Sequence, residues 1–272
     1  MYWSYLLPTI SSLPVGYDCT LPIPIGLLGR RVKLASALVR ADYKVFCEGK
    51  VVEVGEHKLT FSDGKFIGEN APIITIRDLG DKYGGCSGFV EVSISSVDRA
   101  PVFELKSPPG FYAIYSKQGK KSFFSDNAYK YGAPPVISQI AKFGRYVDGY
   151  PVVHLDRSAD LAESAILINP YQRPILATIL SHDSRSLKKR KIPPLSARTI
   201  NLLELLRPGE DHWFGQIQIT ATNRLITFSL KHSFKDPHVI SDHEHMDPFR
   251  ADPTHIPAFQ LLRQHLGKLI TT

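Results

Sequence analysis

Residues 89–94 read Phe-Val-Glu-Val-Ser-Ile, and residues 216–221 read Gln-Ile-Gln-Ile-Thr-Ala. In both stretches a branched apolar side chain occupies every second position, so these side chains share one face of an extended chain. A period of two with one apolar face is typical of a half-buried antiparallel strand. The two stretches therefore predict a β-rich fold, with their valine and isoleucine side chains in its core.

The sequence around the two stretches also matches. Before each lies a strand-like segment that ends on a leucine, Leu79 or Leu205, and then a glycine-containing loop. Each predicted strand opens on a glycine, Gly88 or Gly215, and a polar turn and a further strand follow. The offset between the copies is 126 positions for the leucines (205 − 79) and 127 for the glycines (215 − 88). Self-similarity at a nearly constant offset indicates an internal duplication.

Upstream, residues 34–47 and residues 164–179 each read as strand, polar turn and strand. Residues 169–174, Asn-Pro-Tyr-Gln-Arg-Pro, are a turn signal. Short strands separated by such turns are typical of an antiparallel sandwich. Apolar residues at helical spacing between 259 and 269 predict a helix near the end of the chain.

Length and composition agree with this pattern. The chain has 272 residues, of which 43% are hydrophobic and 22% charged, as in ordinary globular proteins. Its 20 prolines and 19 glycines indicate many turns. We therefore predict an all-β protein of two tandem antiparallel β-sandwich domains, of the immunoglobulin or jelly-roll kind, with a short C-terminal helix. The predicted domains are residues 1–125 and residues 126–272.

Charge and cysteine content bear on partners and location. The net charge of +7 and the pI of about 9.2 suit an acidic partner such as nucleic acid, or keep a soluble protein dispersed. Pro8 and Pro14 interrupt the apolar start, which argues against a signal peptide, and no apolar run is long enough for a transmembrane helix. Cys19, Cys47 and Cys86 lie far apart, which predicts buried thiols in a reducing compartment rather than a zinc site. We expect a cytoplasmic protein.

A segment rich in histidine and aspartate spans residues 236–255. Imidazole and carboxylate groups bind divalent metal ions when three of them converge. The candidate metal ligands are His238, Asp242, His243, His245 and His255. On a strand, His243 and His245 would project to the same side. The alternative is a polar connection into the last helix, because no His-Glu-x-x-His spacing is present. No other cofactor is predicted.

A basic segment is the candidate nucleic-acid contact, through Arg185, Lys188, Lys189, Arg190 and Lys191. Such a run can hold phosphate groups by Coulomb attraction. The alternatives are a solvated hairpin or an edge strand that its charge protects from aggregation. No aromatic residue lies between residues 181 and 211, so this segment offers no base stacking.

Aromatic and basic residues gather where the two predicted domains join. The candidate binding residues there are Tyr129, Tyr131, Arg145, Tyr146 and Tyr150. Tyrosine and arginine are favoured at protein interfaces. The alternative is the packed junction of the two sandwiches.

The second copy also resembles a known family. The order of residues 166–175, Ile-Leu-Ile-Asn-Pro-Tyr-Gln-Arg-Pro-Ile, and residues 192–198, Ile-Pro-Pro-Leu-Ser-Ala-Arg, followed by two strands, resembles the small soluble β-sandwich family typified by the transducer of a cyanobacterial sensory rhodopsin. That family has a single domain, whereas this chain is doubled. The resemblance implies a non-catalytic binding or signalling module that oligomerises through its sheets, and it supplies no functional residue.

The sequence thus favours a non-enzymatic binding or adaptor protein that mediates protein–protein assembly, with itself or with a protein partner. One alternative is a metal-dependent enzyme that uses residues 236–255. Another is a nucleic-acid-binding protein that uses residues 185–191.

Overall fold

The computed structural model describes residues 2–9, 16–22, 36–62, 65–67, 73–83, 85–96, 112–117, 123–126, 128–130, 146–222 and 225–246. Within these ranges the regular structure is almost entirely β-strand, with two short helices, which confirms the all-β prediction. The predicted C-terminal helix lies outside the described residues. None of the helices in the described part of the chain is long and apolar enough to cross a membrane.

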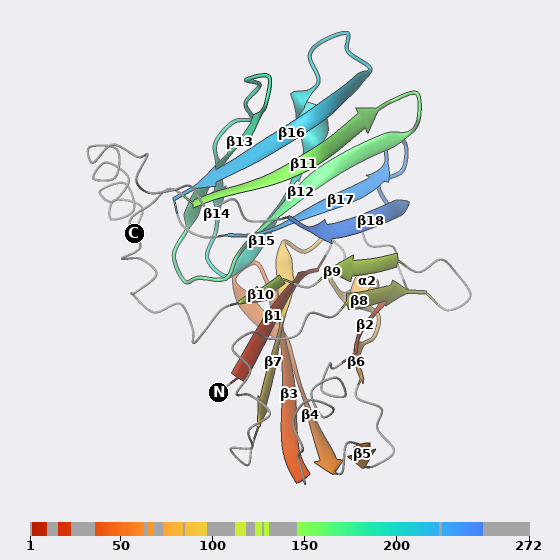
Figure 1. Cartoon of the computed structure of the whole chain (residues 1–272), viewed down its shortest axis with the longest axis vertical. Helices are drawn as coiled ribbons and strands as arrows, with labels where there is room; N and C mark the ends of the chain where they lie inside the picture. The colour runs from red at the N-terminus through yellow and green to blue at the C-terminus, as the bar shows by residue number, and fades with distance from the viewer. Residues whose placement is uncertain are drawn as a thin grey trace. The chain divides into compact units, whose positions relative to one another are not determined.

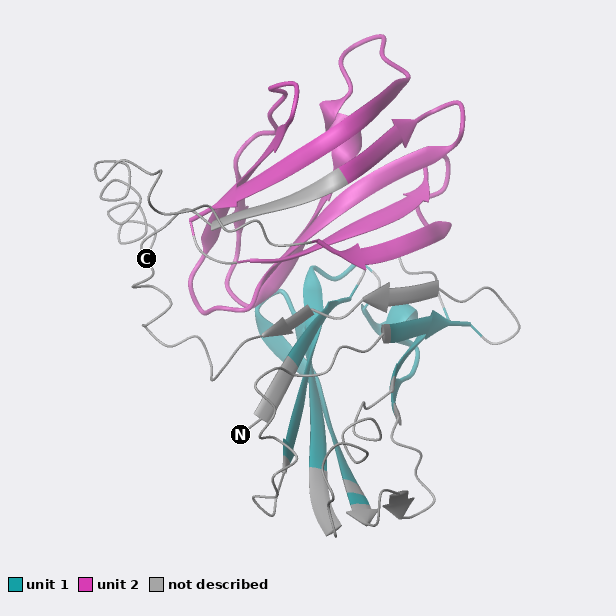
Figure 2. Ribbon diagram, viewed as in Figure 1, with its two compact units in different colours: residues 1–134 teal, residues 135–272 magenta. Residues whose placement is uncertain are grey.

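The chain divides into two compact units, Met1–Pro134 and Pro135–Thr272 (Figure 2). The sequence places the division after residue 125, in a stretch that reads as a polar turn. That stretch contains the short strand β10 (Ala128–Lys130), which pairs with β1 (Tyr2–Pro8) of the first unit. Strand pairing over a long sequence distance, which local composition does not reveal, therefore keeps this stretch in unit 1.

The described part of unit 1 is built from antiparallel strands and a short helix (Figure 1). Besides β1 and β10, its elements are β2 (Asp18–Pro22), β3 (Ser36–Cys47), β4 (Lys50–Ser62), β5 (Lys65–Ile67), β6 (Ile73–Ile76), α2 (Leu79–Tyr83), β7 (Gly88–Ser96), β8 (Tyr112–Ser116) and β9 (Phe123–Asp126). One set of strands has the order β10-β1-β7-β3-β4-β5, and the other has the order β9-β8-β2-β6.

The predicted alternation in β7 is confirmed. Val90, Val92 and Ile94 are at most 1% exposed, whereas Glu91 and Ser93 between them are half-buried. β7 lies between β1 and β3 and pairs with both along most of its length. A strand hydrogen-bonded on both sides with one apolar face belongs in the middle of a sheet.

One prediction for this unit is wrong. Residues 34–47 do not contain a turn, because β3 runs without interruption from Ser36 to Cys47. Arg40 and Asp42 suggest a polar turn in the sequence, but both lie on the same face of the strand, where Arg40 Nε donates to Asp42 Oδ2 at 2.6 Å. An exposed sheet face accepts charged side chains at alternate positions without breaking the strand.

The prediction of three reduced cysteines is also wrong. Cys47 and Cys86 form a disulfide with a Cα–Cα distance of 5.8 Å, and only Cys19 is a buried free thiol. The pairing of β3 with β7 places Cys47 opposite Gly88, two residues from Cys86. The bond therefore joins residues 39 positions apart that come together only in the folded sheet.

Nine elements lie in the described residues of unit 2 (Figure 1). They are β11 (Tyr146–Asp156), β12 (Leu161–Asn169), β13 (Ile175–Ser181), β14 (Arg190–Ile192), β15 (Ser196–Asn201), η2 (Leu202–Leu205), β16 (His212–Ala221), β17 (Ile226–Ser233) and β18 (Ile240–His245). The strands pair in the order β14-β13-β16-β11-β12-β17-β18, and β15 also pairs with β12. β11 and β12 pair at Asp156 and Leu161.

Strands along the whole of this order contribute to one hydrophobic core. Ile217 and Ile219 of β16 are at most 3% exposed, as the alternation predicts. They share the core with Ala165 and Leu167 of β12. This packing fixes which side of β16 faces outward.

The predicted turn at residues 169–174 is confirmed, because β12 ends at Asn169 and β13 begins at Ile175. Asn169 is fully buried, and its Nδ2 donates to the carbonyl oxygens of Arg173, Ile192 and Pro193 at 2.7, 3.2 and 2.9 Å. The side chain thus replaces the backbone partners that these carbonyls lack.

The two units share a pairing order. In unit 1, β7 lies between β1 and β3, and β2 lies between β6 and β8. In unit 2, β16 lies between β11 and β13, and β12 lies between β15 and β17. A short helix, α2 or η2, precedes β7 in the one and β16 in the other.

Candidate binding sites

The fold brings two of the predicted metal ligands in the histidine-rich segment, His243 and His245, onto one face. β18 places the rings of His243 and His245 against the ring of Phe228, with centroid distances of 4.8 and 5.5 Å, so the two histidines share a face as predicted. Burial lowers the pKa of His243 to about 3, which keeps its imidazole neutral.

The other predicted metal ligands lie elsewhere. Asp242 belongs to the opposite face of β18, where its carboxylate accepts a hydrogen bond from Lys231 Nζ at 2.9 Å. His238 lies before the strand, and His255 lies outside the described residues. Across the described part of the chain, no group of three histidine, cysteine or carboxylate side chains could hold a metal ion. A metal site that includes His255 stays a prediction.

In the basic segment, some side chains form ion pairs and others are exposed. Arg190 donates to Glu204 at 2.8 Å from the short edge strand β14. Lys188, Lys189 and Lys191 are exposed. A charged, three-residue edge strand is one of the alternatives that the sequence leaves open, and nucleic-acid binding here stays a prediction.

Arg185 supports the local fold. Its Nη1 and Nη2 donate to the two carboxylate oxygens of Glu210 at 2.5 and 3.2 Å, and its Nε donates to Asp183 at 2.6 Å. Nη1 also donates to the carbonyl oxygen of Leu205 at 2.9 Å. Hydrogen bonds that Ser181 and then Arg185 donate hold the pKa of Asp183 far below its usual value, with burial acting against them. This guanidinium is committed to two carboxylates, so it is not available for phosphate.

The predicted aromatic surface is spread over both units. Tyr129 lies in β10 of unit 1, whereas Tyr146 and Tyr150 lie in β11 of unit 2. Tyr131 and Arg145 lie outside the described residues. A shared binding surface stays a prediction.

A first site that the structure reveals is the edge of β4. The short strand β5 pairs with β4 only at Thr60–Ser62, so the stretch Lys50–Leu59 has a strand partner on one side only among the described residues. Three valines on it are exposed, Val51 at 50%, Val52 at 47% and Val54 at 66%. An unpaired edge presents free N–H and C=O groups, and exposed valines add apolar contact area.

The β3–β4 hairpin is held in shape by its turn and by hydrogen bonds on its inner side. Its two turn residues, Glu48 and Gly49, have φ of 48° and 83°, the left-handed pair that a two-residue hairpin turn requires. On the inner side Glu53 accepts hydrogen bonds from the hydroxyls of Tyr43 and Tyr83 at 2.8 and 2.7 Å. Burial raises the pKa of Glu53, but hydrogen bonds and the charge of Lys82 lower it by more, so this pKa lies below its usual value. The edge is therefore preorganised for a partner.

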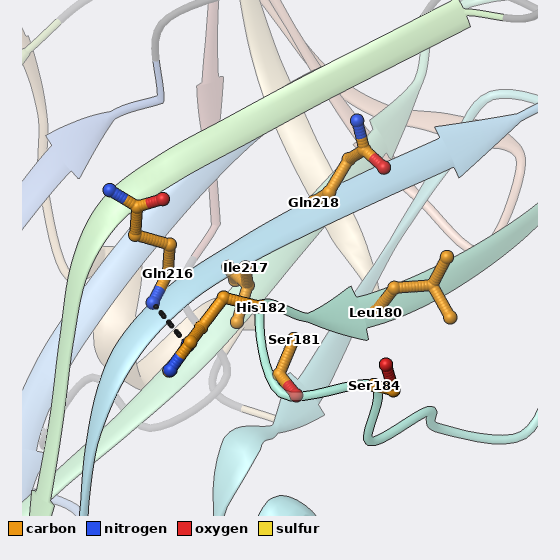
Figure 3. Close-up of a pocket in the computed structure, with 7 residues that line it drawn as sticks. All are labelled: Leu180, Ser181, His182, Ser184, Gln216, Ile217 and Gln218. Atoms are coloured by element: carbon orange, nitrogen blue, oxygen red, sulfur yellow. Dashed lines mark hydrogen bonds between the residues drawn. The ribbon is translucent and has the colours of Figure 1, made fainter.

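A second site is a pocket of about 500 Å³ in unit 2, at the end of β13 beside β16 (Figure 3). It is lined by Leu180, Ser181, His182, Ser184, Gln216, Ile217 and Gln218. The lining contains no aspartate, glutamate, lysine or arginine. Because Ile217 faces the core, alternation sends Gln216 and Gln218 outward, and both are exposed. Within the described residues neither carboxamide takes part in a hydrogen bond.

The ring of His182 is held against the core-facing side of β16, the side opposite the carboxamides of Gln216 and Gln218. Its Nδ1 accepts a hydrogen bond from the backbone N–H of Gln216 at 3.3 Å, so the neutral ring carries its proton on Nε2 (Figure 3). The ring stacks on Trp213 with centroids 5.7 Å apart. It also fills the space where a Cβ on Gly215 would stand, 2.2 Å from the ring. The pocket wall therefore depends on a glycine.

Phe214 extends this outer face along β16. It lies two residues before Gln216, on the same side of the strand, and is 62% exposed. Its ring meets that of His154 on β11 edge-to-face, with centroids 5.8 Å apart. A large aromatic ring held outward in this way offers an apolar platform.

A buried carboxyl group lies in unit 2 away from both sites. Glu163 is 2% exposed, and it accepts hydrogen bonds from the backbone N–H of His154 at 2.8 Å and from the Ser229 hydroxyl at 3.1 Å. Burial raises the pKa of Glu163 to about 7, although the two hydrogen bonds act in the opposite direction. This side chain links β12 to β11 and β17.

Sequence reasoning missed both new sites. In the sequence, Gln216 and Gln218 are only the polar half of a strand pattern, and nothing local separates them from other exposed side chains. The signal for the β4 edge was Val51-Val52-Glu53-Val54, a valine run beside a two-residue turn. That run becomes informative only once the strand order leaves β4 without a second partner.

Comparison with known proteins leaves the family open. No protein-family model matches the chain, and no curated protein sequence does either. Among solved structures, the chain aligns with a β-glucuronidase of Bacteroides uniformis at 12% identity and a TM-score of 0.15, covering 87% of this chain and 27% of that one. A putative β-galactosidase from Bacteroides fragilis aligns at 11% identity and a TM-score of 0.12, covering 90% and 35%. The chain thus spans about a third or less of these proteins, and the similarity carries no functional argument.

Proposed function

We propose that this chain is a non-enzymatic β-sandwich binding protein that assembles with a second copy of itself through the edge of β4. The observation that carries the proposal is the edge described above. From Lys50 to Leu59 it has one strand partner among the described residues, and Val54 beside it is 66% exposed. Strand addition at such an edge is a common mode of protein recognition, because it satisfies the free backbone groups of both chains.

Charge complementarity favours a second copy as the partner. Glu56 and Lys58 lie two residues apart on the same outer face of β4, with Lys58 Nζ 3.1 Å from Glu56 Oε1. In an antiparallel pair centred on His57, residues 55–59 of the two copies pair and each Glu56 faces Lys58 of the partner copy, while Thr60–Ser62 keep their pairing with β5. The same surface on both copies then forms a closed two-fold interface. Opposite charges placed directly across two strands favour pairing, and like charges oppose it.

Sedimentation velocity over a wide range of protein concentration tests this proposal. We expect the wild-type protein to shift from the 30.4 kDa monomer toward twice that mass as concentration rises. Glu56→Lys and Lys58→Glu each place like charges across the interface, so each should weaken association about fivefold or more. The double variant Glu56→Lys/Lys58→Glu restores complementary pairs, so we expect it to associate like the wild type.

Lys188→Glu is the matched control, because it makes the same change of charge at an exposed lysine in unit 2. It should leave the association constant unchanged. A wild-type protein that stays monomeric at every concentration contradicts the proposal. So does an association that Lys58→Glu leaves intact, or one that the double variant fails to recover.

The proposal includes an internal duplication, in which the two units are copies of one sandwich domain. Its support is the shared pairing order, with a short helix before the central strand in each unit. The resemblance to the sensory rhodopsin transducer family supports the same function, since it implies a module that oligomerises through its sheets.

The sequence and the disulfide favour different cellular locations, which an experiment can distinguish. The sequence favours a cytoplasmic protein, whereas the Cys47–Cys86 disulfide supports an oxidising compartment, because disulfides are rare where thiols are kept reduced. Because Cys19 is buried, its thiol reacts only in the unfolded chain, so alkylation in denaturant of cells quenched with acid distinguishes the two. One modified cysteine per chain indicates the oxidised protein, and three indicate the reduced protein.

A further inference from the structure

We propose that the pocket beside β13 and β16 binds a neutral, hydroxyl-rich ligand, with an uncharged oligosaccharide as its chemical class. The site is in unit 2 and does not depend on assembly through β4. Its lining includes two exposed glutamines whose carboxamides make no hydrogen bond within the described residues.

The charges around the pocket favour a neutral ligand. The lining has no ionised carboxylate, lysine or arginine side chain. Asp183 and Glu210, which are not part of the lining, are both bound to Arg185 at distances of 2.6 and 2.5 Å, so one of their two negative charges is offset in place. A charged ligand would lose hydration here without gaining an ion pair, whereas a neutral ligand would not.

The two glutamines match hydroxyl groups in both spacing and chemistry. Alternate residues of a strand stand about 7 Å apart on one face, so Gln216 and Gln218 present two carboxamides along a line. Each carboxamide donates and accepts, and so does each sugar hydroxyl. The hydroxyl of Ser184, which also belongs to the lining, can donate or accept.

The exposed ring of Phe214 supplies the remaining element of such a site. It lies on the same outer face as Gln216, one alternate position further along β16, and its neighbour His154 fixes it edge-on. The apolar C–H face of a pyranose ring packs on an aromatic ring while its hydroxyls stay available to amides. A ligand of several sugar units would reach from the pocket to this platform.

Trp213 provides the readout, because its ring stacks on His182 in the pocket wall. In a Trp3→Phe background, where Trp213 is the remaining tryptophan of the two, we would titrate the full chain with cellohexaose, xylohexaose and mannohexaose. We expect at least one to change the Trp213 fluorescence saturably. Gln216→Ala and Gln218→Ala should each weaken binding about fivefold, and the double variant on the order of twenty-fivefold. Phe214→Ala should weaken it by a similar factor.

Gln172→Ala is the matched control, since it removes the same side chain from an exposed turn outside the pocket lining. It should bind like the wild type, and all variants should unfold at the same temperature because the altered side chains are exposed. The proposal is overturned if none of the three sugars binds, or if the double glutamine variant binds as tightly as the control. It is also overturned if hexaglycine or an oligomer of galacturonic acid binds more tightly than the neutral sugars, since the site would then recognise peptides or anions.

Discussion

Replacing Glu163 by glutamine should remove one pH-dependent contribution to the stability of unit 2, the one that weakens the wild type as pH rises from about 4.5 to about 7. The carboxyl group is 2% exposed and is bound by the His154 N–H and the Ser229 hydroxyl. A glutamine has the same shape. Its oxygen can accept from the His154 N–H, and its amide can donate to Ser229. The substitution therefore removes the titration while it preserves the contacts.

The magnitude follows from the pKa. In the unfolded chain the glutamate pKa is 4.5, and burial raises it to about 7 in the folded protein. Between these values the folded state keeps a proton that the unfolded state releases, so the free energy of unfolding falls as pH rises. The contribution of Glu163 is fully present below pH 4.5 and is lost above about pH 7. The whole change amounts to about 3 kcal/mol.

His243 has the opposite effect on the acid side. Burial lowers its pKa from 6.5 to about 3, so protonation of the unfolded chain reduces stability as pH falls below 6.5. The stability of the wild type alone therefore mixes two opposing slopes. The difference between Glu163→Gln and wild type removes the His243 contribution, since both proteins carry it.

The assay is urea unfolding followed by Trp213 fluorescence in the Trp3→Phe background, at pH 4 and at pH 8. We expect the stability of Glu163→Gln, relative to wild type, to rise by about 3 kcal/mol from the lower to the higher pH. Glu204→Gln, at a side chain that is 47% exposed, serves as the control and should show no such rise. An equal difference at both pH values would refute the reasoning, because Glu163 would then titrate as an ordinary exposed carboxyl group.

Three further predictions concern packing and covalent links. Gly88→Ala should destabilise unit 1 by about 3 kcal/mol, since the new Cβ would stand 1.8 Å from the backbone oxygen of Phe46; thermal unfolding that stays at the wild-type temperature would contradict this. Asn169→Ala should cost about 2 kcal/mol, because it removes the amide that donates to the carbonyls of Arg173, Ile192 and Pro193, of which Pro193 keeps the Ser196 hydroxyl as a donor; urea unfolding of unit 2 followed through Trp213 measures this cost. Replacing both Cys47 and Cys86 by alanine should lower the free energy of unfolding by about 4 kcal/mol, because the bond closes a loop with a sequence separation of 39; the wild type in excess reductant should lose the same amount.

The sequence predicts the fold well where the signal is local. The alternation in β7 and β16 identifies both central strands, because each is buried on one face along its length. The same rule fails in β3, where Arg40 and Asp42 form an ion pair on an exposed face and imitate a turn. Local polarity does not distinguish a turn from the outer face of a sheet.

The candidate sites were harder to predict because each depends on strand order. The β4 edge is free only because β5 is three residues long and pairs at one end. Arg185 reads as part of a basic run, yet the fold brings Glu210, 25 positions later, to its guanidinium. The Cys47–Cys86 disulfide likewise requires β3 to lie beside β7.

The shared pairing order has a consequence for how the chain folds. In each unit, an early strand pairs with a strand that is synthesised much later. Tyr2 of β1 pairs with Ser95 of β7, a separation of 93 positions (95 − 2). Tyr146 of β11 pairs with Ala221 of β16, a separation of 75 positions (221 − 146). Contacts this distant in sequence make folding slow. During synthesis β1 must remain unpaired until β7 has left the ribosome, so the nascent chain exposes an apolar strand for most of the time that unit 1 is being made. We expect a chaperone that binds extended apolar segments to bind β1 at this stage.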